Sequence, residues 1–289
     1  MHDATANRSL TNRGIWTVCM VGLVALHPRI AFGETGVTWR TLQPGVELAT
    51  IDFEPRAPSS DNKLIAVRID PHLSPLTLAL ATEKDKRPRP AADWCRVAGL
   101  AVAINAGMFQ DDGLSNVGHL VDGDHVNSSR WASKYHSVLA FGPRDPKLPS
   151  AIMVDLDEDG SREKLRAYKT VIQNLRLIKA ADGHGRNVWQ EQNRRWSEAA
   201  IALDDHSRVL FLFSRSAVSM AEFNRRILDL PLGIERAMHV EGGPEASLSI
   251  HVGGIDTDYF GSFETGFMEN DGNHRPWPIP NVLGVAKAP

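Results

Sequence analysis

The sequence predicts an α+β fold, a single domain in which a few helices pack on a mixed, mostly antiparallel sheet. Three observations support this prediction. Short apolar runs with strand composition recur along the chain, each bounded by Gly, Pro or short polar residues. The clearest helical periodicity is in one segment, residues 219–230. Residues 34–289 are enough to bury a sizeable core and suit one domain.

The first 33 residues have the pattern of a secretory signal peptide. Arg8 and Arg13 precede an apolar run from Ile15 to Leu26, and a small-residue cleavage site follows at Ala31–Gly33. The apolar run is shorter than the roughly 20 residues that a stable membrane anchor needs. We therefore expect residues 34–289 to be periplasmic or secreted, with no stable membrane anchor after cleavage.

Composition excludes some classes of partner and of stabilisation. The formal net charge is -3, and the charged residues are scattered without a basic stripe, which argues against a nucleic-acid partner. Cys19 lies in the signal peptide, so Cys95 alone remains and no intramolecular disulfide forms. The basic stretch at residues 84–90 contains two prolines, and we expect it to be a solvated loop.

Strand predictions follow the apolar runs. Residues 63–70 and 75–80 are separated by a Pro-containing turn, which favours a pair of neighbouring edge strands. A hairpin is expected from residues 199–203 and 209–213, because the short polar residues between them tolerate turn dihedrals. Further strands are expected at residues 101–104, 137–141, 152–154 and 171–178.

The predicted helix begins at Ser219, which has capping-box spacing to Glu222. Its apolar residues then follow along one face at helical spacing: Phe223, Ile227 and Leu230. Strands at residues 210–213 and 237–240 flank this helix, which indicates a β-α-β-like unit. From Gly253 onward the chain is rich in Gly, Pro and aromatic residues, and we expect an ordered tail laid over the domain.

Two segments place polar groups and glycines at strand ends. In the first, Asn105 ends an apolar strand and Gly107 follows, so that a backbone could approach a ligand closely. In the second, Glu241 ends a strand and is followed by Gly242 and Gly243, which suits a carboxylate facing a cleft. Ordinary turn chemistry also explains either segment when it is taken alone.

Taken in order, the segments resemble the phosphodiester glycosidase family over residues 98–252. Four family motifs are matched, and their order is more specific than any one of them. The matching residues are Asn105, Ala106, Gly107 and Phe109; then Gly118, Asp122 and Gly123; then Gln173 in a Gln-containing strand; and last Glu241, Gly242, Gly243 and Ser247.

Three departures from the family pattern stand out. The family's usual Asp before Gly-Gly is Glu241 here, and Glu245 stands where the family often has Ser. The usual Gln-Ser-Gly-Pro becomes Gln173 followed by Asn-Leu-Arg, which adds Arg176. The family arginine before the strand near Ala199 has no match in register.

The resemblance implies an exported glycosidase that hydrolyses a sugar-1-phosphodiester or a related envelope glycan linkage. It implies Glu241 and Asp122 as catalytic residues, with Glu241 the acid or base. The implied substrate-binding residues are Asn105, Gly107, Phe109, Gln173, Arg176, Gly242, Gly243 and Ser247. We expect Asn105, Gln173 and Glu241 to line one cleft.

The competing hypothesis is a non-catalytic envelope protein that binds a glycan or another anionic polymer, because a fold does not carry its chemistry with it. In both hypotheses the partner is a carbohydrate or sugar phosphate. No cofactor or metal is expected. His119, Asp122, Asp124 and His125 match none of the usual zinc spacings and fit a hairpin around residues 122–123.

Overall fold

Two sheets make up most of the part of the chain that the computed structural model describes, residues 36–53 and 61–288. The expected signal peptide at residues 1–33 lies outside these residues, so export stays a prediction. No helix within them is long and apolar enough to cross a membrane.

The larger sheet is antiparallel throughout its described pairings. Its main path runs in the order β1 (Arg40–Gln43), β2 (Val46–Asp52), β3 (Lys63–Ile69), β13 (Val209–Val218), β12 (Trp196–Asp204), β14 (Ile234–Gly242), β10 (Tyr168–Ala181), β6 (Leu120–Asp122) and β7 (His125–Ser128). Strands β11 (His184–Asn187) and β8 (Ser137–Pro143) also pair with β10, and β9 (Ala151–Asp155) pairs with β8.

The smaller sheet is also antiparallel and carries the first chemical segment. Its order is β16 (Ile255–Phe260), β15 (Ser247–Val252), β5 (Leu100–Asn105), β17 (Asn281–Ala286) and β4 (Leu76–Leu80). The short helical elements are α1 (Ala81–Lys84), α3 (Ser161–Leu165) and the 3-10 turn η1 (Gly243–Glu245).

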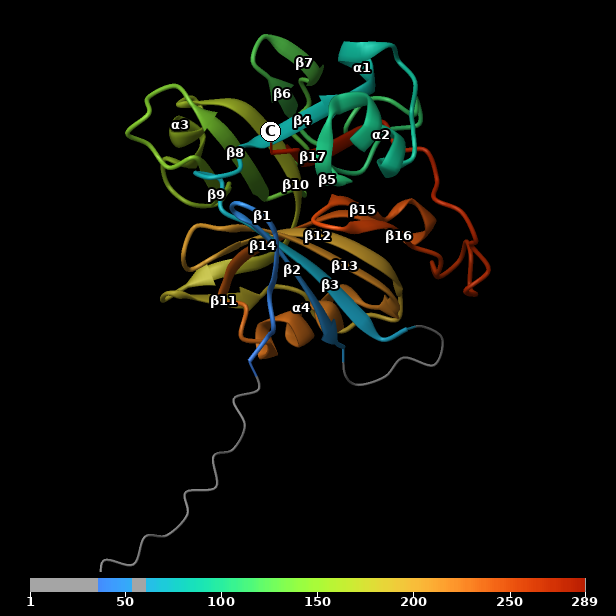
Figure 1. The fold of residues 1–289 in the computed structure, drawn as a ribbon. Coiled ribbons are helices and arrows are strands. Elements are labelled where there is room, and N and C mark those ends of the chain that lie inside the picture. Colours follow the sequence, from blue (N-terminus) through green and yellow to red (C-terminus); the bar gives the residue numbers. More distant parts are fainter. Residues whose placement is uncertain (1–35, 54–60, 289) are drawn as a thin grey trace, which may run out of the picture. The chain divides into compact units, whose positions relative to one another are not determined.

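The main core lies between the two sheets, and helices cover their outer faces (Figure 1). In β3, Ile65 and Val67 face the main core, whereas the alternate residues Leu64 and Ala66 pack under α4 (Met220–Asp229). Helix α2 (Ala91–Ala98) packs its buried Trp94 against the outer face of the smaller sheet. The predicted α+β class, mostly sheet with few helices, is confirmed in part, because the described strands form two sheets instead of one and all of their pairings are antiparallel instead of mixed.

Several element predictions are confirmed in detail. The Ser219 hydroxyl caps α4 by accepting the backbone N–H of Glu222 at 3.2 Å. Strands β12 and β13 form the predicted hairpin, with Ala199 opposite Phe213. Strands β13 and β14 both pair antiparallel with β12, so they run parallel to each other on either side of it, as a β-α-β-like unit requires.

Two predictions about strand partners are wrong. Strand β3 lies inside the larger sheet between β2 and β13, whereas β4 is an edge of the smaller sheet and pairs with β17. The C-terminal segment is more than a covering tail, because β17 is buried between β5 and β4. Apolar composition identifies a strand, but it does not specify the distant segment that pairs with it.

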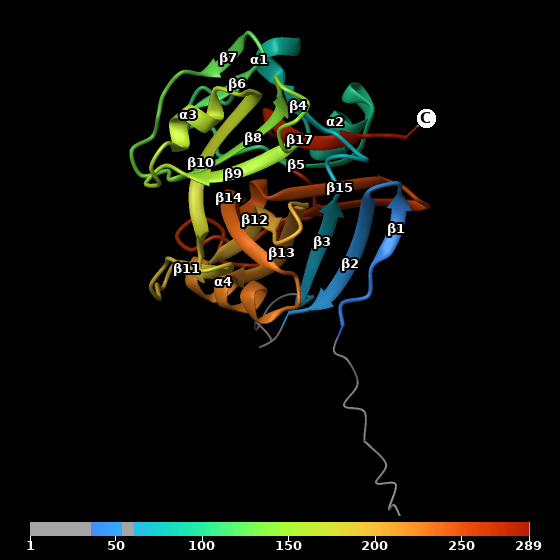
Figure 2. The same ribbon diagram turned by 90° about the vertical axis from the view of Figure 1, so that its left-hand side faces the viewer.

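Strand β10 joins two groups of strands (Figure 2). Its first half pairs with β6 and β8, and its second half pairs with β14 and β11. Because side chains alternate along a strand, Lys169, Val171, Gln173 and Leu175 lie on one face of it. This face borders both of the cavities discussed below.

Asn105 connects the two sequence segments that carry the resemblance. It is only 1% exposed at the end of β5. Its Oδ1 accepts the backbone N–H of Ser247 at 2.7 Å, and its Nδ2 donates to the backbone carbonyl of Glu245 at 3.0 Å. The side chain thus holds the turn after β14 against the smaller sheet.

Replacing Asn105 with Ala should therefore destabilise the fold. The substitution leaves the buried Ser247 N–H without this acceptor, whereas the Glu245 carbonyl keeps the Ser247 hydroxyl as a donor, and we expect unfolding to become easier by about 1–3 kcal/mol. Denaturant unfolding measures this loss. The exposed Asn193→Ala variant is the control, and an equal effect in both variants would contradict the role given to Asn105.

Candidate active site

A cavity of about 410 Å³ lies where β14 and the 3-10 turn meet the segment that follows β5. Its wall combines aromatic, apolar and acidic groups, including Met108, Phe109, Arg194, Trp196, His239, Glu241, Gly242, Glu245 and Glu264. Aromatic walls with a few converging polar groups are typical of small-molecule sites.

A buried chain of polar side chains supports this cavity. Glu198 is 0% exposed and His239 is 3% exposed. One Glu198 oxygen lies 2.5 Å from Nδ1 of His239, and the other accepts the indole N–H of Trp196 at 2.6 Å. Burial opposes a charge on His239, but the charge of Glu198 and its hydrogen bond raise the pKa of His239 above its usual value.

The pairing of β12 with β14 shifts register beside this chain. Ala199 lies opposite Glu241, but Ala200 lies opposite His239, so Val240 is one extra residue in β14. A bulge of this kind bends and twists a strand locally, and bulges are common next to active sites. The irregularity falls between the two cavity-lining residues His239 and Glu241.

Glu241 is a cavity residue whose pKa lies far above its usual value. Burial raises its pKa to about 8, against the opposing effects of His239 and of the Gly242 backbone N–H, which lies 3.1 Å from Oε1. The charges of Glu245 and Glu264 raise the pKa further. Burial also raises the pKa of Glu245. At neutral pH Glu241 is therefore mostly protonated.

The two glycines after Glu241 have distinct steric roles. A Cβ on Gly242 would lie 2.7 Å from the Trp196 ring. Gly243 has a φ of +65°, and a Cβ there would lie 2.7 Å from a Glu264 carboxylate oxygen. Side chains at these positions would displace two walls of the cavity, so the glycines allow Trp196 and Glu264 to approach β14.

Three of the residues implied by the resemblance line the cavity: Phe109, Glu241 and Gly242. Four others lie behind its walls as buried support: Asn105, Gly107, Gly243 and Ser247. Gly107 packs against the side chains of Asn116 and Asn174, because a Cβ there would lie 2.5 Å from each Oδ1.

The expectation that Asn105, Gln173 and Glu241 line one cleft requires correction, since only Glu241 lines it. Gln173 is fully buried, and its amide bonds to the backbone of His119, Ala132 and Tyr135. Direct ligand binding would break these bonds.

Arg176 and Asp122 also lie outside the cavity wall. Arg176 is paired with Asp157 at 2.8 Å and with Asp155 at 3.6 Å, so its guanidinium is committed to carboxylates of the protein. Asp122 belongs to the hairpin of β6 and β7, where its carboxylate accepts the hydroxyl of Thr170 at 2.5 Å.

Glu198, His239 and Glu264 are functional residues that no sequence motif identifies. The sequence contains a signal for the first two, because Glu198 directly precedes the apolar run Ala199–Leu203 and His239 lies between the apolar residues Met238 and Val240. Buried polar groups of this kind need partners, and two of them in separate strands favour a mutual contact. Glu264 lies in an irregular segment, and no comparable pattern marks it.

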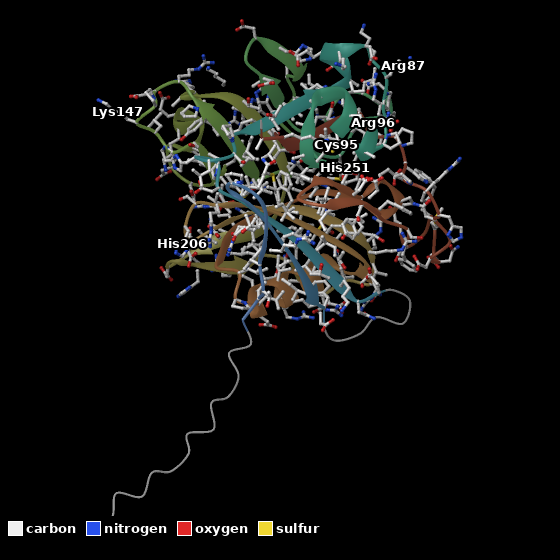
Figure 3. All side chains as sticks on the ribbon, in the orientation of Figure 1. Arg87, Cys95, Arg96, Lys147, His206 and His251 are labelled. Carbon is white, nitrogen blue, oxygen red and sulfur yellow. The ribbon has the colours of Figure 1, made fainter. Side chains whose placement is uncertain are left out.

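A larger cavity, of about 700 Å³, lies between α2 and the hairpin of β15 and β16. Cys95, Arg96 and His251, labelled in Figure 3, belong to its lining. Burial raises the pKa of the Cys95 thiol to about 12, so this thiol is not a nucleophile at neutral pH. None of the residues implied by the resemblance lines this cavity, and we do not assign the site to it.

One group of residues in the described part of the chain could hold a metal ion, and it lies outside both cavities. Asp204, Asp205 and His206 have donor atoms close enough to share an ion. However, the Asp204 carboxylate already accepts the backbone N–H groups of His206 and Arg208 and the Arg208 side chain, so it closes the β12–β13 turn.

Comparisons with known proteins agree with this architecture. The catalytic domain of the zebrafish N-acetylglucosamine-1-phosphodiester alpha-N-acetylglucosaminidase, auto-inhibited by its pro-peptide, has a TM-score of 0.56 and 10% identity, with 86% of this chain and 84% of that chain covered. A hypothetical protein from Synechocystis has a TM-score of 0.52 and 14% identity, with 85% of this chain and 64% of that chain covered. These likenesses show the fold. No curated protein matches the chain.

Fold and site together define a mostly antiparallel β protein with a cavity lined by half-buried carboxyl groups. The profile of the phosphodiester glycosidase family matches residues 98–286, and the chain belongs to that family. The family resemblance seen in the sequence is therefore confirmed. It suggests phosphodiester glycosidase activity in general terms.

Replacing Glu198 with Gln should lower the pKa of His239, because the carboxylate that favours the imidazolium is lost while burial still opposes the charge. NMR titration of the imidazole measures this fall in pKa. The exposed Glu83→Gln variant is the control. An unchanged His239 titration in the Glu198 variant would contradict the coupling.

Proposed function

We propose that this chain is an exported glycosidase that hydrolyses the bond between a sugar's anomeric carbon and a phosphodiester oxygen, or a related envelope glycan linkage. The single observation that carries the proposal is the position of Glu241. It lines a cavity with aromatic walls, and its raised pKa of about 8 leaves it with a proton at neutral pH.

Glu241 would serve as the general acid. A protonated carboxyl group near the leaving oxygen can donate its proton as the glycosidic bond breaks, and a pKa near the working pH suits that role. His239 and Glu198 position β14 beside it. Family membership supports this reaction class, and the zebrafish relative carries the phosphodiester in its name.

Glu245 replaces Asp122 as the second carboxyl group in this proposal. It lines the same cavity as Glu241, whereas Asp122 does not. Its ionised form would take a proton from the water that attacks the anomeric carbon, as the base of a carboxyl pair does. Trp196 and Phe109 would pack against the sugar, and Arg194 would meet the phosphate.

The substrate is proposed to be an envelope glycan because the N-terminal pattern predicts export. Intact-mass analysis of the exported protein tests this part: the expected chain starts near Glu34. A mature species that still carries the apolar run Ile15–Leu26 would contradict it.

Glu241→Gln should lower kcat/KM on a sugar-1-phosphodiester by about a hundredfold or more, because the amide keeps the shape of the carboxyl but cannot donate its proton. The assay is hydrolysis of a panel of sugar-1-phosphodiesters by the purified protein. Asp122→Asn is the matched control, and we expect it to retain near-parent activity. Full activity in Glu241→Gln would contradict the proposal. So would saturable binding of every substrate without turnover, which would favour the binding-protein hypothesis.

The pH dependence gives an independent test. As a general acid, Glu241 must be protonated, so kcat/KM should fall as the pH rises through about 8. The residual activity of Glu241→Gln should lack this descending limb. A rate that rises through the same pH would assign Glu241 as a base instead.

A further inference from the structure

A second hollow, of about 420 Å³, lies between α3 and the first half of β10. Four of its lining residues are cationic: Arg144, Arg162, Arg166 and Lys169. The rest of the lining is aromatic, aliphatic, Gly or His, with no carboxylate. This hollow shares no lining residue with the cavity around Glu241.

The positive charges of this hollow are largely uncompensated. Within the described ranges, Arg166 has an ion pair with Glu163 at 2.5 Å, in which both side chains are exposed. No ion pair joins Arg144, Arg162 or Lys169 to a carboxylate described in the structure. Since the whole chain has a formal net charge of -3, this is a local concentration of positive potential that attracts anions.

Aromatic side chains organise one of the cations. The Arg162 guanidinium lies over the Trp131 ring, 4.3 Å from its centroid, and His119 stacks on the same Trp131 at 4.2 Å. A guanidinium held by its face keeps its N–H edges available for two-pronged contact with an oxyanion. Burial, together with the Arg162 charge, lowers the pKa of His119, so the arginines and Lys169 supply the positive charge.

Gln173 fixes this aromatic wall in place. Its Oε1 accepts the backbone N–H of His119 at 3.0 Å and that of Ala132 at 2.9 Å, and its Nε2 donates to the carbonyls of Ala132 and Tyr135. The glutamine that the family resemblance pointed to as a ligand-binding residue thus anchors the segment that carries Trp131.

The two cavities share one face of β10. Lys169 and Val171 line the basic hollow, and Leu175 on the same face lines the cavity around Glu241. Six residues of strand separate Lys169 from Leu175, which corresponds to about 20 Å. The segment that contributes Trp131 to the basic hollow also contacts a residue of the other cavity, because the Tyr135 hydroxyl donates to Met108 Sδ at 3.8 Å.

We propose that the basic hollow is a second site, which binds a phosphoryl group with two or more negative charges through Arg144, Arg162 and Lys169. The site stands on its own charges and geometry. If the proposed hydrolysis is also correct, this site holds a second phosphate of an extended substrate whose scissile bond lies at Glu241. This assignment of the ligand rests on the proposed function, whereas the binding of a phosphoryl group does not.

Inorganic pyrophosphate is the probe, titrated into the full mature chain by calorimetry at low and high NaCl. We expect saturable binding that weakens as salt rises, because the contacts are exposed charges. The variant Arg144→Gln/Arg162→Gln should weaken the affinity tenfold or more. The control Arg87→Gln/Arg186→Gln removes the same charge from exposed residues outside the hollow and should change the affinity less than twofold.

The variant Glu241→Gln tests whether the basic hollow binds pyrophosphate independently of the cavity around Glu241. Pyrophosphate affinity that is unchanged in this variant supports a separate site, whether or not the parent hydrolyses any phosphodiester. The proposal is overturned if the parent shows no saturable binding, if both double variants weaken it equally, or if Glu241→Gln weakens it as much as Arg144→Gln/Arg162→Gln. Circular dichroism of each variant confirms that the fold is retained.

Discussion

The buried contact between Glu198 and His239 is the interaction on which the candidate site depends. Removing two such groups from water costs several kcal/mol per charge, and a buried pair repays this only when its remaining polar atoms are bonded. Glu198 meets that condition by using its second oxygen to hold the Trp196 indole. The pair fixes β12 against β14, sets Trp196 where only Gly242 fits beneath it, and places Glu241 two residues from the imidazole. The main effect of the Glu198–His239 pair is to fix the positions of Trp196 and Glu241 in the cavity wall.

Much of the fold could be predicted from local sequence, since periodicity and capping are local properties. The helix that begins after Ser219 and the β12–β13 hairpin follow directly from them. Strand partners could not be predicted in the same way, because a run such as residues 76–80 pairs with β17 some 200 residues later. The same limit applies to the site. Glu241 was identified because its own turn marks it, whereas its neighbours Glu198 and Glu264 arrive from distant segments.

The family motifs have two kinds of role in this chain. Some present groups to the cavity, as Phe109 and Glu241 do. Others, including Asn105 and Gln173, bond their amides to backbone partners and hold the loops that form the walls. A sequence motif alone does not distinguish these roles, because an amide at a strand end suits a ligand and a neighbouring backbone equally well. Burial and hydrogen-bond partners distinguish them.

The proposed function requires that burial keep Glu241 protonated at neutral pH. The most direct measurement is a ¹³C NMR titration of glutamate side-chain carboxyl groups, with Glu241→Gln used to assign the signal that disappears. The account predicts that this one carboxyl titrates near pH 8. A Glu241 signal that titrates near the ordinary glutamate pKa of about 4.3 would contradict it, because the group would then be ionised at neutral pH and could not donate a proton.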